Sequence, residues 1–420
     1  MSEPVKPRRA AVASFLPGPP VDRTRVEGWQ RWVRTRDLFV PAPVLSMEQY
    51  LQLTPRRRRI HDLHRLATHS SLPLQSTPMS EAVDWLVNAR IEDGAYSHKA
   101  GIRTGVMVNG GGAQGKTETV CAALAAFEEN WLEVNEYVNP EAMAGTRDLL
   151  APVVYVRCPV QATPVSTCQR ILDFYGEDYK NMRQADLIRT VNAAIYAHAT
   201  KALVIDDITR LKLHRERDQD VLDLLLEIMS MSVTLILVGV GIPTSGLLRR
   251  GSFNPVTKEW VIPPVNDRGR SPNPYASTQH ERRFEMIDLQ PFSYDTPEKI
   301  VAWVNHLAAL ERSLRLLHDT EGVLTSGSMP EYLFQRTNGV VGLLEKLVQR
   351  GCRVAIEEGS EWLTKDLLNR CAVSPTDLPD LDADSGEQPL IPPVKPSPKK
   401  RQRSRNTVYD DAGPTAESAG

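Results

Sequence analysis

The feature that most constrains the fold is a glycine-rich segment between a strand-like run and a helix-like run. Residues 110–117 read Gly-Gly-Gly-Ala-Gln-Gly-Lys-Thr and satisfy the pattern G-x-x-x-x-G-K-[ST]. The apolar run 106–108 precedes them, and apolar residues between 120 and 131 follow at intervals of four, three and four residues, which is one face of an α-helix. A strand, a glycine loop and a helix in this order cradle a phosphate group. The pattern predicts an α/β domain that binds a nucleotide.

Each residue type in this segment has its own physical role. Glycines let backbone N–H groups turn inward around an anion, and the helix N-terminus adds partial positive charge. Lys116 is suited to reach the terminal phosphates of ATP, and the Thr117 hydroxyl is suited to ligate Mg²⁺. The alternative, a glycine-rich turn with an incidental lysine, does not explain the flanking strand and helix. The predicted nucleotide-binding residues are Gly110, Gly111, Gly112, Ala113, Gln114, Gly115, Lys116, Thr117 and Glu118.

An acidic group that completes the metal site with Thr117 is expected at the end of a buried strand. Residues 202–207 read Ala-Leu-Val-Ile-Asp-Asp, an apolar run that ends in two carboxylates. We expect Asp206 to hold Mg²⁺ on the Thr117 side and Asp207 to orient the water that attacks the γ-phosphate. An aspartate pair after a strand also serves as a helix N-cap or a turn, which is the alternative interpretation.

Short apolar runs alternate with helical periods over much of the chain, which predicts a parallel sheet flanked by helices. From residue 297 onward the strand signals stop and a helical period continues. We therefore predict a P-loop NTPase fold followed by a small all-helical lid domain, with disordered tails at both ends. The predicted strands are 106–108, 153–156, 203–205, 235–238 and 286–289. The predicted domains are a basic, partly disordered N-terminal arm (1–60), the nucleotide-binding domain (61–295) with a long surface insertion (251–280), the lid (296–372) and a disordered tail (373–420).

Composition excludes several classes of protein. The chain has no run of 18 apolar residues, and its N-terminus lacks the continuous apolar segment of a signal peptide, so we expect a cytoplasmic protein that does not contact the membrane. The five cysteines are scattered and form no C-x-x-C pair, which favours reduced, apolar cysteines over disulfides or a zinc site.

The N-terminal region carries an excess of positive charge. Residues 1–60 contain 12 Lys or Arg against 5 Asp or Glu, including the run Arg56–Arg59. Such a segment favours a polyanion such as DNA, and the alternative is a solvated basic arm with no specific partner. Trp29 and Trp32 lie among arginines and could dock on a transposase or stack on a base, but a role in the core or in a subunit contact is favoured over stacking. The next residues include His61, His64 and His69, for which a solvated helix face is favoured over a metal site.

These motifs occur in the order seen in AAA+ ATPases, which the chain resembles over about residues 45–370. The order comprises the loop at 110–117, the strand at 202–207, the strand at 233–239, Arg283-Phe284 before a strand, and the helical segment 339–342. Within that superfamily the chain is similar to the TniB/TnsC-type ATPases that regulate DNA transposition. This second resemblance rests on the sequence segments 152–156, 202–208 and 337–359.

The resemblance implies an ATPase that assembles side by side on double-stranded DNA when ATP is bound. The assembly, a ring or a filament, would recruit or stimulate an integrase-like transposase. Self-association puts the nucleotide at a subunit interface, where an arginine from the neighbour neutralises the γ-phosphate. Arg283 occupies the position of such an arginine finger, with Arg282 beside it, and the alternative is a surface arginine pair.

The chain departs from the AAA+ pattern at three places. Asp207 stands where the family usually has Glu, and its shorter side chain is expected to slow hydrolysis because catalytic geometry is demanding. Residues 238–241 offer no polar sensor side chain, so Thr244 or Ser245 would have to serve, and residues 339–342 lack the usual arginine. The alternatives left open are an ATP-gated binding switch with little hydrolysis, a STAND-type ATPase, and a helicase-loader-type ATPase.

Overall fold

The computed structural model describes residues 14–16, 18–99, 101–140, 150–160, 162–210, 216–244, 281–318 and 320–373, and the short strands within 252–261. All of these residues belong to one compact unit, Met1–Pro375. The predicted tail, 373–420, lies outside the described residues from 374 onward, and so does most of the predicted insertion. Within that insertion, β5 (Ser252–Asn254) and β6 (Glu259–Val261) form an antiparallel pair.

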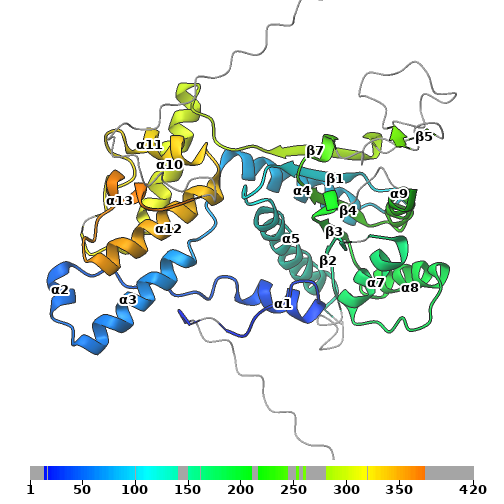
Figure 1. Cartoon of the computed structure of the whole chain (residues 1–420). Coiled ribbons are helices and arrows are strands. Elements are labelled where there is room, and N and C mark those ends of the chain that lie inside the picture. The colour runs from blue at the N-terminus through cyan, green and yellow to red at the C-terminus, as the bar shows by residue number, and fades with distance from the viewer. Residues whose placement is uncertain are drawn as a thin grey trace, which may run out of the picture. The chain divides into compact units, whose positions relative to one another are not determined.

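A five-stranded parallel sheet forms the centre of the α/β part (Figure 1). Its strands lie in the order β2-β3-β4-β1-β7, so β4 separates β1 from β3. Helices lie in the chain segments that join β1 to β2, β2 to β3 and β3 to β4, as crossovers in a parallel sheet require, and all five strands end on the same side of the sheet. The strands are β1 (Gly105–Gly110), β2 (Val153–Arg157), β3 (Ala202–Asp206), β4 (Thr234–Gly239) and β7 (Phe284–Leu289), which confirms the five predicted strands.

Helices cover this sheet and share its core. The central strands β3 and β4 are buried along their whole length, as expected for apolar runs in a parallel sheet. Helix α4 packs on α5, β1, β4 and β7, while α7 packs on α8, α9 and β2. The helices are α4 (Pro78–Ala95), α5 (Lys116–Val138), α7 (Pro164–Tyr175), α8 (Gln184–Ala197) and α9 (Glu216–Ser230), with single turns η1 (Ile208–Arg210), η2 (Ile242–Thr244) and η4 (Glu281–Arg283).

The C-terminal part of the described chain has a separate hydrophobic core, built by helices and the loops between them, without strands. Trp303, Leu333 and Leu344 are fully buried in it. Its helices are α10 (Pro297–Arg312), α11 (Met329–Thr337), α12 (Val341–Glu358) and α13 (Lys365–Asn369), and we call this part the lid.

The N-terminal helices pack against both parts of the described chain. The indole of Trp29, in α1 (Val26–Thr35), is 1% exposed, stacks on Tyr155 of β2 and donates a hydrogen bond to Glu128 at 2.8 Å. The core role preferred for Trp29 is therefore correct, and Trp32 packs against the same core. After α2 (Met47–Leu51), helix α3 (Pro55–Ser70) packs on α12 of the lid.

The prediction of a solvated helix face for the histidines is wrong for two of them. His61 and His69 lie on the buried face of α3, and burial lowers the pKa of both imidazoles, that of His69 to about 4. His69 Nε2 accepts a hydrogen bond from the backbone N–H of Arg315. The face is buried because α3 packs on the lid, a contact that a charge run cannot reveal. Among the described residues, no cluster of His, Cys, Asp and Glu is arranged to hold a metal ion.

Candidate functional site

The glycine-rich loop joins β1 to α5 through two residues in the left-handed region. Ala113 has φ +57° and Gly115 has φ +80°, and these conformations turn the chain sharply into the helix. Gly110 has no room for a side chain, because a Cβ there would lie 2.7 Å from the Leu289 carbonyl oxygen. Gly115 is the N-cap of α5, and no side chain caps the helix. The first backbone N–H groups of α5 are thus left for an anion.

Lys116 and Thr117 begin α5 and point to the predicted partners. Lys116 Nζ donates a hydrogen bond to the Gly111 carbonyl oxygen at 2.6 Å, so the ammonium group lies over the loop. Burial lowers the pKa of Lys116, while the charges of Asp206 and Asp207 act in the opposite direction. Thr117 Oγ1 donates to Asp206 Oδ2 at 2.8 Å, across 89 residues of sequence. The loop and the end of β3 therefore form one site.

Asp206 is held firmly at this site. It is buried, with 4% of its surface exposed, and its Oδ2 also accepts a hydrogen bond from the Tyr155 hydroxyl at 2.7 Å. Its Oδ1 accepts from the backbone N–H of Asp207 at 2.8 Å. Burial and the neighbouring Asp206 raise the pKa of Tyr155, so the phenol stays protonated and donates. Tyr155 was not predicted as a site residue, because an aromatic residue in an apolar strand looks like any core residue.

The residues present fit a magnesium nucleotide. A carboxylate and a hydroxyl already in contact are the hard oxygen ligands that Mg²⁺ prefers. The left-handed loop, the uncapped helix and the lysine suit the phosphates. Thr117 and Asp206 would hold the metal, and Lys116 with the loop backbone would hold the phosphates.

Glu118 has a partner that the sequence did not reveal. Arg23 forms a double hydrogen bond with its carboxylate, at 2.7 and 3.1 Å. The Arg23 guanidinium also lies over the rings of Trp32 and Tyr155, with its central carbon 5.1 and 5.7 Å from their centroids. The segment before α1 thus contacts the first turn of α5. Nothing in the sequence distinguishes Arg23 from the eleven other basic residues of the N-terminal region.

Asp207 follows β3 directly and is half-buried. Its φ of +57° is left-handed, a conformation that Asp tolerates better than most residues. The two acidic residues therefore have different surroundings: Asp206 is fixed by Thr117 and Tyr155, whereas Asp207 lies past the end of the strand.

The lid touches the loop at one glycine. The backbone N–H of Gly342, in the first turn of α12, donates to the Ala113 carbonyl oxygen at 2.9 Å. A Cβ at Gly342 would lie 2.5 Å from that oxygen, so only glycine allows this approach. The segment 339–342, which lacks the usual arginine, thus reaches the loop through its backbone. At the end of β4, the N–H of Ile242 donates to Asn109 Oδ1, Thr244 ends η2, and Ser245 lies outside the described residues.

Arg283 lies on the side of the sheet where the strands begin, whereas the loop lies on the side where they end. It ends η4, directly before β7, and Phe284 pairs with Gly105 at the start of β1. The six-residue strand β1 separates this position from the loop by about 17 Å, more than an arginine side chain spans. Arg283 is half-buried and Arg282 is exposed. Arg283 therefore does not reach the nucleotide site of its own chain.

The chain is similar to one family model and to several solved structures. Residues 105–242 match the family model described as AAA domain. Similar solved structures include the ORC2 protein of Aeropyrum pernix in ADPNP–ADP complexes, at 15% identity over 71% of this chain and 69% of that one, with a TM-score of 0.43. The ORC1 protein of Aeropyrum pernix in complex with DNA is 14% identical over 72% and 66% of the two chains, with a TM-score of 0.47. The Cdc6p protein of Pyrobaculum aerophilum is 13% identical over 73% and 69%, with a TM-score of 0.42.

No curated protein sequence matches the chain significantly. Among the described residues, no helix combines the length and the apolar character needed to cross a bilayer. The parallel sheet, the loop between β1 and α5 and the family match agree with one another. Residues 105–242 match the AAA domain model, and the described chain has the AAA+ P-loop fold with a helical lid.

Proposed function

We propose that this protein is an ATP-hydrolysing AAA+ protein that assembles on double-stranded DNA and regulates transposition by recruiting or activating an integrase-like transposase. The observation that carries the nucleotide part is the contact between Thr117 and Asp206, with Lys116 over the same loop. A hydroxyl and a buried carboxylate are in contact there, and an ammonium group lies over the same loop.

The proposed roles follow from this geometry. Lys116 and the loop backbone bind the phosphates, while Thr117 and Asp206 bind Mg²⁺, with Tyr155 keeping Asp206 in place. When bound, Mg²⁺ supplies positive charge that offsets the charge on the phosphates. Asp207 orients the attacking water. Arg283 stabilises the transferred γ-phosphate, and it does so in the site of a neighbouring subunit.

Two observations support assembly on DNA. Arg283 is too far from the loop of its own chain to reach it, which agrees with a role for this arginine in the site of a neighbouring chain. The excess of positive charge in residues 1–60 favours a polyanion. The transposition role rests on the resemblance of residues 152–156, 202–208 and 337–359 to the TniB/TnsC-type ATPases.

A second candidate is a switch that binds ATP and scarcely hydrolyses it. Asp207 favours this candidate, because its side chain is shorter than the usual Glu and its backbone is left-handed past the end of β3. A water-orienting carboxylate set back from the phosphates slows the reaction without weakening binding. DNA-bound assemblies with ATP and negligible turnover would be the result that selects this candidate.

The test is ATP hydrolysis by the full chain with and without duplex DNA, with electron microscopy of the same mixtures in a slowly hydrolysed ATP analogue. We expect DNA-stimulated turnover and ordered oligomers on the duplex. Lys116→Ala should abolish nucleotide binding and turnover, and Asp206→Asn should reduce turnover about 100-fold or more, since charge stabilisation at the metal is a large part of catalysis. Arg183→Ala, at an exposed position before α8, is the control and should behave like the wild type.

Absence of any DNA response and of any assembly would overturn the DNA and transposition parts of the proposal. Turnover that persists in Lys116→Ala would overturn the assignment of the site. Stimulation of turnover by a transposase encoded beside this gene would support the transposition role, and a protein that leaves the activity of that transposase unchanged would contradict it.

A further inference from the structure

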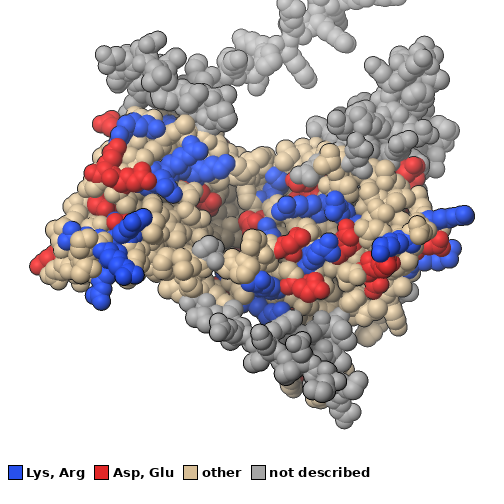
Figure 2. All heavy atoms as spheres, turned by 60° about the horizontal axis from the view of Figure 1, so that its bottom comes forward, with Lys and Arg blue, Asp and Glu red and all other residues tan. Residues whose placement is uncertain are grey.

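Helix α3 presents a basic, partly apolar face to solvent. Arg56, Arg59, Ile60 and Leu63 follow one another at intervals of three, one and three residues, which places them on one side of the helix. The three side chains of Arg56, Arg57 and Arg59 are exposed, and Ile60 and Leu63 are 47% and 54% exposed. Figure 2 shows basic side chains gathered on the side of the molecule where α2 and α3 lie. We call Arg56, Arg57 and Arg59 the basic turn.

The basic turn does not stabilise its own helix. Its side chains make no ion pair or hydrogen bond with the part of the chain that the structure describes, and the first turn of α3 contains no acidic residue. Cations at a helix N-terminus oppose the helix dipole, and like charges three residues apart repel each other. Arg58, in contrast, donates to the carbonyl oxygens of Leu51 and Leu53. The fold explains Arg58 and leaves the basic turn unexplained.

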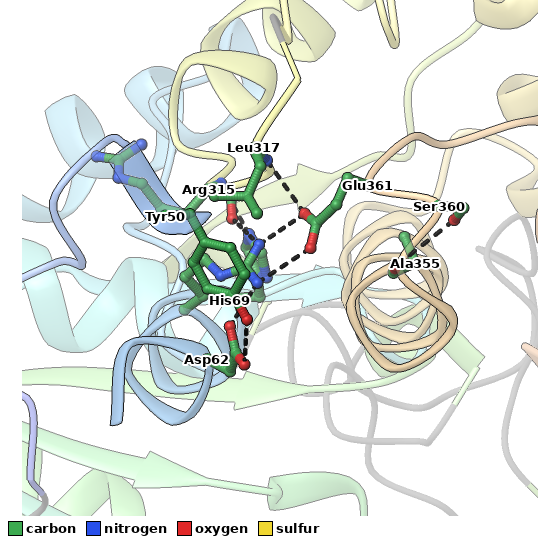
Figure 3. A network of polar contacts seen from close by, with 9 residues as sticks. Tyr50, Asp62, His69, Arg315, Leu317, Ala355, Ser360 and Glu361 are labelled. Carbon is green, nitrogen blue, oxygen red and sulfur yellow. Dashed lines mark hydrogen bonds and ion pairs between the residues drawn. The ribbon is translucent and has the colours of Figure 1, made fainter. Parts of the chain in front are cut away.

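The opposite face of α3 is locked to the lid by a buried ionic network (Figure 3). Arg65 is 1% exposed and forms a double hydrogen bond with Glu361, at 2.6 and 3.1 Å. It also bonds Asp62 at 2.6 Å, and Asp62 in turn accepts from the Tyr50 hydroxyl. Glu361, which follows α12, accepts a further bond from the Leu317 backbone N–H. The basic turn is therefore attached to the lid through α3.

The lid in turn contacts the nucleotide loop. The N–H of Gly342 at the start of α12 binds the Ala113 carbonyl oxygen, and α3 packs against α12. A change at the loop that shifts the first turn of α12 also shifts α3, because packed helices joined by a buried ion pair move together.

We propose that the basic turn of α3 binds the phosphate backbone of double-stranded DNA and that its attachment to the lid couples this contact to the nucleotide site. The inference rests on the proposed function for the presence of DNA and adds the surface and its regulation. Guanidinium groups bind phosphates in a forked geometry, and unpaired cations on one turn of a helix match the closely spaced charges of a duplex. Ile60 and Leu63 add apolar contact to the sugars beside the phosphates.

The experiment compares two full-chain variants that lose the same charge. The test variant is Arg56→Gln/Arg57→Gln/Arg59→Gln, and the matched control is Lys180→Gln/Arg183→Gln/Arg189→Gln, at exposed positions in and before α8. Affinity for a fluorescent duplex is measured by anisotropy at several salt concentrations, with the ATP analogue and with ADP. Hydrolysis without DNA and thermal unfolding verify that both variants are folded and retain the nucleotide site.

We expect the test variant to bind the duplex about 10- to 100-fold more weakly than the wild type. The magnitude of the slope of log K against log salt should fall by about 2 to 3, since each phosphate contact contributes about 0.9. The control should bind like the wild type. The wild type should bind more tightly with the ATP analogue than with ADP, and the test variant should lose most of that difference.

Three outcomes would overturn the inference. A test variant that binds DNA like the wild type excludes the basic turn, and an equal loss in the control shows that net charge alone matters. A test variant whose ratio of affinities in the ATP analogue and ADP is unchanged excludes the coupling. A wild type that binds no duplex in either nucleotide contradicts the DNA part of the proposed function itself, which is a separate failure.

Discussion

Single residues at the nucleotide site are held by neighbours from distant parts of the chain. Asp206 takes its position from Thr117 and Tyr155, and the loop accepts the lid only because residue 342 is glycine. On the side of α5 facing α1, Glu128 is buried beneath Trp29 and accepts its indole N–H. Burial raises the pKa of Glu128 to about 7, so this carboxyl group titrates near neutral pH.

Because its pKa is raised, Glu128 should make the stability of the protein depend on pH. Between pH 4.5 and about 7 the folded protein keeps the proton on Glu128, whereas the unfolded chain releases it. The contribution of protonated Glu128 to the stability of the fold is therefore complete below pH 4.5 and is lost as the pH rises through 7. Glu128→Gln stays neutral and keeps an acceptor for Trp29. The variant should be more stable than the wild type by about 1–3 kcal/mol at pH 8 and nearly equal to it at pH 4.5. Urea unfolding at both pH values measures this, and a constant difference between the two proteins would contradict it.

At the scale of elements, α3 belongs to the lid although it precedes the α/β sheet in sequence. The chain runs from α1 on the sheet to α3 on the lid and back to α4 on the sheet. The Arg65–Glu361 pair holds α3 against the lid, and both side chains are almost fully buried. Removal of one partner of such a pair leaves the other charge buried, whereas removal of both avoids that cost.

A double-mutant cycle tests this attachment. Glu361→Met should lower the free energy of unfolding by about 3 kcal/mol, because the buried Arg65 loses a carboxylate and keeps Asp62 and the Arg315 carbonyl oxygen as partners. Arg65→Met/Glu361→Met should cost clearly less than the sum of the two single changes. Leu317 N–H loses its acceptor whenever Glu361 is replaced, so this loss cancels in the comparison. Denaturant unfolding of the four proteins gives the coupling energy, and strictly additive values would refute a coupled pair.

At the scale of the whole molecule, the sheet separates Arg283 from the loop by the length of a strand. A finger that acts on a neighbouring chain makes each active site depend on two subunits. Subunits with different defects can then complement each other, which a site contained in one chain does not allow.

Mixing experiments measure this dependence. Arg283→Ala and Asp207→Asn should each lose turnover about 100-fold or more, and a mixture in equal amounts should recover activity at about a quarter of the interfaces, where an intact site meets an intact arginine. Arg282→Ala should keep most of its turnover. ATP hydrolysis on duplex DNA is the readout. A mixture no more active than its components would argue that Arg283 does not act between subunits.

The parts that the sequence predicted are those with a local pattern. The five strands, the helix after the loop and the helical lid were read from apolar periodicity, which depends on neighbours within one element. The loop was read from its glycines and lysine for the same reason. The buried face of α3 was misread, because a row of arginines and histidines looks solvated until its packing partner is known.

The amino-acid sequence by itself determined that this protein has a glycine-rich loop between a strand and a helix, a parallel sheet, and an aspartate at the end of β3. Only the tertiary structure decided that Arg23 binds Glu118, that Arg65 binds Glu361 across 296 residues, and that Gly342 touches Ala113. Local pattern follows from the chemistry of adjacent residues. A pairing between distant residues depends on how whole elements pack, because burial, not residue type, chooses which of many equivalent charges meet.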